Sequence, residues 1–153
     1  MQLRLKPSDP ATTDSTRVAV ERYLSALNEG DVDAIAECVT EDFFNEHTSS
    51  LGESCRGRDA YRARLPRFLS QFRDLNYEIE DIVLQDERAA VPYRMSCTWL
   101  DKSGSSHLVQ IRGMFYLRVV GGRIAHRIDY WDSAEFRRQV ETSVASNTLG
   151  PKG

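Results

Sequence analysis

Apolar positions recur at helical spacing in the first half of the chain and at every second position in the second half. Helical runs cover residues 15–28 and 58–72, and a short one follows Asp31, which can cap its N-terminus. Gly30 ends the first helix, because glycine readily adopts a left-handed conformation. The apolar positions are Val18, Val20, Tyr23, Leu24 and Leu27 in the first run, Ile35, Cys38 and Val39 in the short one, and Tyr61, Leu65, Phe68, Leu69 and Phe72 in the third.

A period of two from Leu75 onward predicts strands. A polar hairpin loop joins two of them, and Gly121-Gly122 predicts a tight turn, since glycine tolerates positive φ. A turn after the second helix leads into a short extended piece ending near Thr48. The predicted segments are strands at 75–84, 89–100, 107–120 and 123–131 and a final helix over 133–142.

Helices placed ahead of an antiparallel meander predict an α+β fold. We expect a cone-shaped α+β barrel, with the N-terminal helices packed on a curved, mainly antiparallel sheet and a cavity between the layers. The 153 residues predict a single domain over residues 13–143, preceded by a flexible lead-in over 1–12 and followed by a flexible tail over 144–153.

Composition and charge reduce the range of functions that this chain is expected to have. A formal net charge of −3 disfavours nucleic-acid binding, and the chain lacks the run of about 18 apolar residues that would predict a membrane helix. The N-terminus lacks the apolar core of a secretory signal. Cys38, Cys55 and Cys97 are scattered without metal-binding spacing, so we expect reduced thiols in a cytoplasmic protein that holds no metal.

The last strand carries an ionisable residue, Asp129, where an apolar one is expected. Asp132 is explained as the N-cap of the final helix, with Glu135 completing a capping box. Asp129 has no such local explanation, so this carboxylate is either in a salt bridge or functional. Strand alternation places Arg127 and Trp131 on the same face as Asp129.

Four segments carry a family pattern: Asn28–Ala34, Phe43–His47, Arg56–Ala60 and Gly122–Asp132. In this order they resemble the SnoaL-like group of the nuclear transport factor 2-like superfamily, over about residues 15–143. The resemblance implies the cone-shaped fold, a small apolar oxygenated ligand, no cofactor, and a homodimer formed through the outer face of the sheet. This superfamily hosts cyclases, isomerases, dehydratases, epoxide hydrolases and non-catalytic domains, so the resemblance is more specific for fold than for activity.

Two types within this group bear on the chemistry. The polyketide-cyclase type uses an Asp similar in position to Asp129 as acid/base for an aldol closure, and a pocket histidine similar to His47. The limonene epoxide hydrolase type also implies a catalytic carboxylate at Asp129, and its water-positioning pair falls on Asn45 and His47. Its Arg-x-Asp pair falls near Met95–Cys97, where this chain has neither residue, so that constellation is incomplete.

We therefore expect Asp129 and His47 to be catalytic. The residues expected to bind substrate are Asn45, Arg127, Trp131, Tyr61 and Arg94.

Other interpretations stay open. Asp129 could pair with Arg127 or Arg94 merely to balance a buried charge, and His47 could be a loop histidine bonded to backbone. Arg94 could lie on the outer face beside Glu78 or Glu80. His107 follows a polar hairpin, so we expect it to be exposed.

Three functions compete on this evidence. The first is a cofactor-independent enzyme that cyclises or isomerises a polyketide-like carbonyl compound by Asp general acid/base catalysis. The second is an epoxide hydrolase or an epoxide-opening cyclase. The third is a non-catalytic ligand-binding or dimerisation module, which the incomplete hydrolase constellation favours. Substitution of Asp129 by Asn separates an enzyme, which would lose turnover, from a structural ion pair, which would lose stability.

Overall fold

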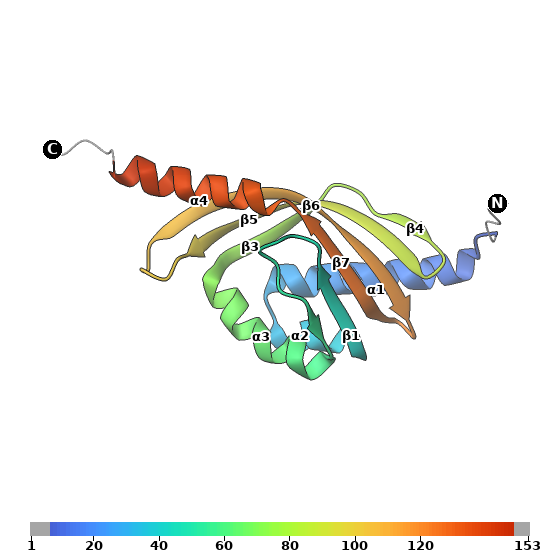
Figure 1. The fold of residues 1–153 in the computed structure, drawn as a ribbon. Helices are drawn as coiled ribbons and strands as arrows, with labels where there is room; N and C mark the ends of the chain where they lie inside the picture. Colours follow the sequence, from blue (N-terminus) through green and yellow to red (C-terminus); the bar gives the residue numbers. More distant parts are fainter. Residues whose placement is uncertain (1–6, 149–153) are drawn as a thin grey trace.

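The computed structural model of the protein describes residues 7–148, which form a curved sheet with helices against it (Figure 1). Residues 1–6 of the predicted lead-in and residues 149–153 of the predicted tail lie outside this range. The final helix, predicted over 133–142, continues to Thr148, so residues 144–148 of the predicted tail are helical. The helices are α1 (Pro10–Glu29), α2 (Val32–Glu37), α3 (Arg58–Gln71) and α4 (Ser133–Thr148). The strands are β1 (Val39–His47), β2 (Cys55–Arg56), β3 (Phe72–Ile79), β4 (Val83–Gln85), β5 (Arg88–Leu100), β6 (Ser106–Val120) and β7 (Arg123–Trp131).

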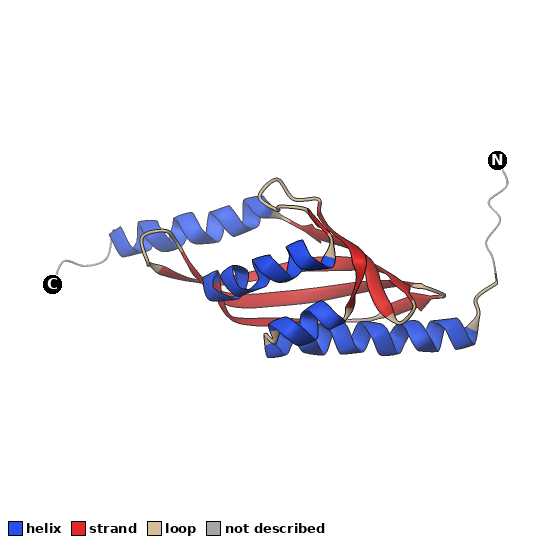
Figure 2. Cartoon of the chain, turned by 90° about the horizontal axis from the view of Figure 1, so that it is seen from below, coloured by secondary structure: helices blue, strands red, loops and turns tan. Residues whose placement is uncertain are grey.

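The strands join one sheet in the order β2-β1-β7-β6-β5-β3, with β4 paired to β5. β1 runs parallel to β7, and the other pairs are antiparallel. The sheet curves around α1, α2 and α3, which cover its concave face (Figures 1 and 2). The predicted α+β fold with N-terminal helices on a curved, mainly antiparallel sheet is confirmed. The sheet remains open between β2 and β3, so the cone is not a closed barrel.

The first helix begins five residues earlier than predicted. Asp9 is its N-cap: its carboxylate accepts from the Ala11 N–H at 3.0 Å. Proline then occupies the first helical position, where its missing N–H is no loss. Residues 10–12, assigned to the lead-in from the sequence, are therefore helical. Val18, predicted to be apolar core, is 66 % exposed, and Ala19 is buried in its place.

The predicted start of α2, the predicted end of α1 and the predicted turn between β6 and β7, where Gly121 and Gly122 have positive φ, are confirmed. The predicted extent of α2 is not, because the helix ends at Glu37, before Cys38 and Val39. Asp31 caps α2 by accepting from the Ala34 N–H at 3.1 Å, and Gly30 ends α1 with a φ of 67°. β1 is longer than the short extended piece predicted, because Val39 starts a strand that continues to His47. This extension matters, since it places a second strand directly beside β7.

Two side-chain amides complete the strand edges. Asn28 on α1 donates to the Tyr77 carbonyl at 3.0 Å and accepts from the Tyr77 N–H at 2.7 Å, along the free edge of β3. Gln139 on α4 makes the same pair of bonds with Gln110, at 2.6 and 2.8 Å, where β6 runs beyond its pairing with β7. Both helices are thereby fixed to the sheet, and backbone groups that lack a neighbouring strand are satisfied.

None of the four helices within residues 7–148 has the length and apolar character that crossing a membrane requires.

Candidate functional site

Two charged residues of β7, Arg127 and Asp129, point into the concave side of the sheet. Asp129 is 4 % exposed and Arg127 5 % exposed, which confirms the alternation predicted along this strand. The parallel register of β1 and β7 sets His47 beside Asp129 and Asn45 beside Arg127. Four of the predicted site residues therefore meet on two adjacent strands, as a direct consequence of β1 extending to His47.

The two carboxylate oxygens of Asp129 have different surroundings. Oδ1 accepts from the Tyr93 hydroxyl at 2.6 Å. Oδ2 has no hydrogen-bond donor among the described residues; it lies 3.7 Å from Arg127 Nη2 and 3.9 Å from His47 Nδ1. Burial raises the pKa of Asp129, and the Arg127 charge and the Tyr93 hydrogen bond only partly oppose this rise. The site therefore holds a carboxyl group that is a stronger base than an exposed aspartate.

Arg127 is held mainly by groups other than Asp129. Its Nη1 donates to the Tyr23 hydroxyl at 2.7 Å, and its guanidinium lies 4.7 Å from the centre of the Phe115 ring. The Tyr23 hydroxyl is in turn 2.8 Å from that of Tyr61. Burial disfavours the charge, but the surrounding tyrosine and Asp129 oxygens outweigh it and keep the pKa of Arg127 well above its usual range. A tight ion pair between Arg127 and Asp129 is thus not what the geometry shows.

His47 is a neutral hydrogen-bonding group. Burial, with the nearby Arg127 and Arg64 charges, lowers the pKa of His47 to about 3. The Trp131 indole N–H donates to His47 Nδ1 at 3.1 Å, so the ring proton lies on Nε2. The approach of Nδ1 to Asp129 is therefore not an ion pair at neutral pH, and the histidine offers an N–H donor from Nε2.

The loop that joins β1 to β2, residues 48–54, packs directly on His47. A Cβ added to Gly52 would lie 2.3 Å from the His47 Cβ, so this position has no room for a side chain. The Thr48 N–H donates to the Asp129 carbonyl at 3.2 Å, and Ser50 reaches Ser133 at the start of α4, 2.9 Å away. The loop therefore restrains His47. The His47 side chain is 16 % exposed to solvent, whereas that of Asp129 is 6 % exposed.

Half-buried aromatic rings extend the site beyond Asp129. Phe136 of α4 lies 5.2 Å from Trp99 and 6.2 Å from Trp131 between ring centres, and Phe68 stacks on Phe72 at 4.6 Å. We call these five rings the aromatic cluster. They come from α3, β3, β5, β7 and α4, so the wall next to the carboxylate is assembled from distant parts of the chain.

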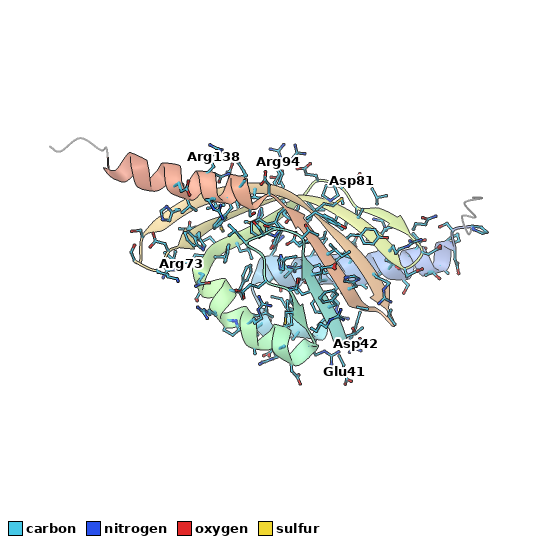
Figure 3. All side chains as sticks on the ribbon, viewed as in Figure 1. Glu41, Asp42, Arg73, Asp81, Arg94 and Arg138 are labelled. Carbon is cyan, nitrogen blue, oxygen red and sulfur yellow. The ribbon has the colours of Figure 1, made fainter. Side chains whose placement is uncertain are left out.

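Two expectations from the sequence need correction. Arg94, expected to bind substrate, points away from the concave face (Figure 3) and pairs with Glu80, which also binds Arg112. The alternation of β5 puts position 94 on the outer face of the sheet. His107 is buried and not exposed, because it faces inward beside Trp99 and bonds to Asp101 at 2.9 Å.

Tyr93 is the site residue that the sequence interpretation missed. It lies between Arg94 and the apolar residues of β5, where a tyrosine is ordinary strand composition. Two features of the sequence could have indicated Tyr93: strand alternation points its side chain inward, and a glycine, Gly113, lies opposite it on the neighbouring strand. Tyr61 does face inward as expected, but its hydroxyl reaches Arg127 through Tyr23.

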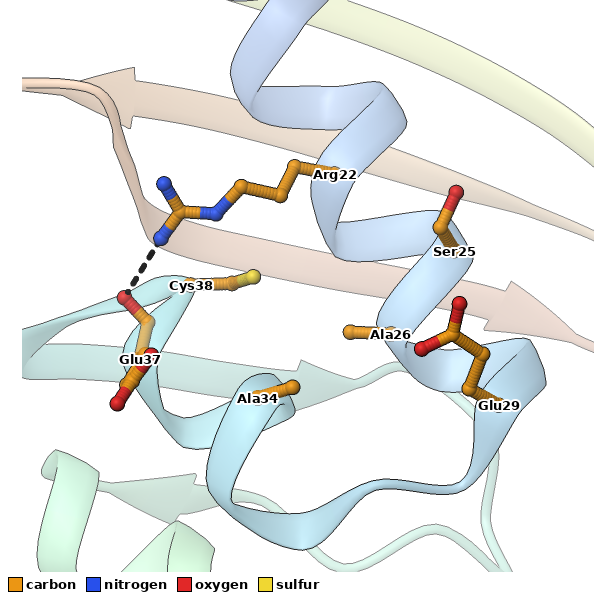
Figure 4. A pocket seen from close by; sticks show the side chains of 7 residues that line it. All are labelled: Arg22, Ser25, Ala26, Glu29, Ala34, Glu37 and Cys38. Atoms are coloured by element: carbon orange, nitrogen blue, oxygen red, sulfur yellow. Dashed lines mark hydrogen bonds between the residues drawn. The ribbon is translucent and has the colours of Figure 1, made fainter.

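The surface hollow between α1 and α2 is separate from this site. Its volume is about 410 Å³, and Arg22 donates to the Glu37 carbonyl across it at 3.3 Å (Figure 4). It is lined by Arg22, Ser25, Ala26, Glu29, Ala34, Glu37 and Cys38, none of them near the β7 carboxylate. Among the described residues, no cluster of three His, Cys, Asp or Glu side chains could hold a metal ion. That the protein needs no cofactor stays a prediction.

A family model, that of the SnoaL-like domain, matches residues 20–127. The chain belongs to the SnoaL-like domain family. The resemblance predicted from the four sequence segments is thereby confirmed.

Solved structures share this SnoaL-like fold. A protein named as a SnoaL-like polyketide cyclase from Shewanella denitrificans is 15 % identical over 88 % of this chain and 99 % of its own, with a TM-score of 0.75. An epoxide hydrolase of M. tuberculosis, described as LEH-like, is 20 % identical over 93 % of this chain and 100 % of its own, with a TM-score of 0.73. A protein named as a ketosteroid isomerase from Kribbella flavida is 24 % identical over 78 % of each chain, with a TM-score of 0.60. No curated protein matches the sequence.

The structural similarity to these proteins shows the fold of the SnoaL-like domain, and at such low identities it does not show the reaction. Proteins with this fold are named as a cyclase, a hydrolase and an isomerase, so the fold does not identify the reaction. The residues around Asp129 must decide between these reactions.

Proposed function

We propose that this SnoaL-like domain is a cofactor-independent enzyme that cyclises or isomerises an apolar, oxygenated, polyketide-like carbonyl compound, with Asp129 as general acid/base. One observation carries the proposal: the buried carboxylate has one oxygen held by Tyr93 and the other without a hydrogen bond from any residue that the structure describes, beside a neutral histidine. A carboxylate that only balanced a charge would make its hydrogen bonds to Arg127.

The proposed reaction begins at the acidic C–H between two carbonyl groups. Asp129 Oδ2 takes the proton, and the electron pair of the C–H bond forms an enolate. His47 Nε2–H donates to the carbonyl oxygen on which negative charge develops, as an oxyanion donor does. The enolate carbon then attacks a second carbonyl of the same molecule, forming a C–C bond, and Asp129 returns the proton to the new alkoxide. Return of the proton to a different carbon gives an isomer instead.

Two further buried atoms fit a ligand with both a donor and an acceptor. Asn45 Oδ1 and Arg127 Nε have no hydrogen-bond partner within the described part of the chain. Buried polar groups are normally paired, so a substrate hydroxyl could donate to Asn45 and a substrate oxygen could accept from Arg127. The aromatic cluster would contact the apolar remainder of the molecule.

Epoxide hydrolysis by two carboxylates is less well supported. Asp129 is the one carboxylate among the buried polar residues of the described chain, and Met95 and Cys97 occupy the strand where the hydrolase type carries its Arg-x-Asp pair. Opening of an epoxide by an internal hydroxyl, with a single acid/base, remains chemically compatible with this site and is distinguished by the experiment below.

We also propose that the protein is a homodimer through the outer face of the sheet. Met114 and Tyr116 on β6 and Ile128 and Tyr130 on β7 point outward and are partly or largely exposed, Tyr130 by 43 %. A contiguous apolar strip of this kind on a sheet face is typical of a protein–protein interface.

The function is tested by incubating the protein with epoxides and β-dicarbonyl polyketide mimics in ¹⁸O-labelled water and reading products by mass spectrometry. Asp129→Asn is compared with Asp132→Asn, the same chemical change at a helix cap where asparagine serves equally well. An isomer of unchanged elemental composition that Asp129→Asn fails to form supports cyclisation or isomerisation. Label in a diol product indicates epoxide hydrolysis, and no Asp129-dependent conversion supports a non-catalytic ligand-binding module.

A further inference from the structure

Tyr93 reaches the candidate base from two strands away. Tyr93 on β5 pairs with Gly113 on β6, and Gly113 pairs with Trp131 on β7. Neighbouring strands lie about 4.8 Å apart, so the phenol must pass over the whole of β6 to contact Asp129. The 2.6 Å hydrogen bond to Oδ1 therefore depends on what occupies position 113.

Gly113 is the residue that leaves this path open. A Cβ at position 113 would lie 2.3 Å from the Tyr93 hydroxyl oxygen, 2.5 Å from Tyr93 Cζ and 2.8 Å from the Tyr130 carbonyl oxygen. Contacts this short are excluded by van der Waals repulsion. Gly113 does not have a positive φ, so its backbone conformation does not call for glycine. Space for the Tyr93 phenol, which makes the two shortest of these contacts, and for the Tyr130 carbonyl accounts for the absence of a side chain.

The Tyr93 ring cannot move aside. Its centre lies 4.5 Å from that of Phe115 and 5.0 Å from that of Tyr77, and the residue is 3 % exposed. Rings packed this closely in a core resist displacement. The hydroxyl is therefore held against Asp129 by packing as well as by its hydrogen bond.

We infer that Tyr93 and Gly113 are a pair of positioning residues that hold the Asp129 carboxylate in the orientation needed for proton transfer, an inference that rests on the proposed function. Tyr93 occupies Oδ1 and leaves Oδ2 as the basic oxygen. Because the phenol donates to the charged form of the carboxylate, it also lowers the pKa of Asp129 against the rise caused by burial. Gly113 acts through Tyr93, by providing the room that the phenol occupies.

The test measures the pKa of Asp129 directly, by ¹³C NMR of labelled carboxyl groups in the substrate-free protein. The variants are Tyr93→Phe, Gly113→Ala and, as a matched control, Tyr77→Phe, which removes a neighbouring buried phenol that does not bond to Asp129. Loss of the donor destabilises the carboxylate, so the pKa of Asp129 is expected to rise in the first two variants and to stay in place in the control. Where turnover is measurable, it should fall about tenfold at a fixed pH below the raised pKa and recover at higher pH.

A second measurement tests the role of Gly113 even if Gly113→Ala folds poorly. Tyr93→Leu lacks the two Tyr93 atoms nearest to the added Cβ, so Gly113→Ala should lower the unfolding midpoint much less in that background. An equal loss of midpoint in both backgrounds would overturn the steric pairing.

An unchanged pKa in Tyr93→Phe would overturn the positioning role, whatever the turnover. Raised pKa values without any Asp129-dependent turnover would instead count against the proposed function and leave the positioning of the carboxylate intact.

Discussion

Replacing Asp129 by asparagine removes the proposed base while keeping the side-chain shape and an oxygen that can accept from Tyr93. Burial raises the pKa of Asp129 in spite of Arg127 and Tyr93, so the ionised carboxylate is less stable in the folded protein than in the unfolded chain. A neutral amide avoids this cost. Arg127 loses an attraction across 3.7 Å but keeps its hydrogen bond to Tyr23.

These opposing effects predict that the free energy of unfolding of Asp129→Asn at pH 7 stays within about 1 kcal/mol of the parent protein. Breaking a hydrogen-bonded buried ion pair would cost about 3–5 kcal/mol instead. Turnover, by contrast, should fall by roughly 10²–10⁴-fold, the usual contribution of a positioned acid/base. Urea unfolding and a product assay on the same samples give both quantities.

The pH dependence has a definite sign. Because the folded pKa is raised above the ordinary value of 3.8, the contribution of Asp129 to stability is fully present below pH 3.8 and is lost as the pH rises through the folded pKa. The asparagine variant should therefore gain stability relative to the parent over that range. A loss of several kcal/mol with turnover unchanged would refute this account and establish Asp129 as the structural partner of Arg127.

Three further predictions concern other positions. Turnover should show no titration near pH 6.5 from His47, whose pKa is about 3, whereas His47→Ala should lower kcat about 10²-fold; a rate–pH limb near 6.5 that disappears in this variant would contradict the neutral donor. Arg94→Ala should change neither turnover nor the unfolding midpoint, because Arg94 is exposed and Glu80 retains Arg112; an increase in KM would return Arg94 to the substrate site. Tyr130→Glu should shift the protein from dimer to monomer in sedimentation velocity, and a parent protein that already sediments as a monomer would contradict the proposed interface.

Local patterns predicted the elements of this fold because each depends on residues close together in the sequence. Strand β7 was predicted with both ends correct, and its alternation correctly placed Arg127, Asp129 and Trp131 on one face. The cap at Asp31 was likewise predicted correctly from short-range chemistry. The start of α1 was missed because Asp9 precedes a proline, and proline within the first turn does not interrupt a helix.

The chemistry of the site depends on the pairing of strands that are distant in the sequence, and no local sequence pattern predicts that pairing. The sequence left open whether Arg94 binds substrate or lies on the outer face beside Glu80, because the answer depends on which face of the sheet the helices cover. Tyr93 was invisible as a site residue because its contact to Asp129 spans 36 positions and crosses an intervening strand.

From the sequence alone, periodicity determined the helices and most of the strands, alternation exposed an unexplained carboxylate on the last strand, and the resemblance of four segments indicated the SnoaL-like family. The tertiary structure decided which oxygen of that carboxylate is free, that His47 is neutral with its proton on Nε2, and that Gly113 admits Tyr93. Burial and strand register set these properties, and both exist only once β1, β5, β6 and β7 lie side by side.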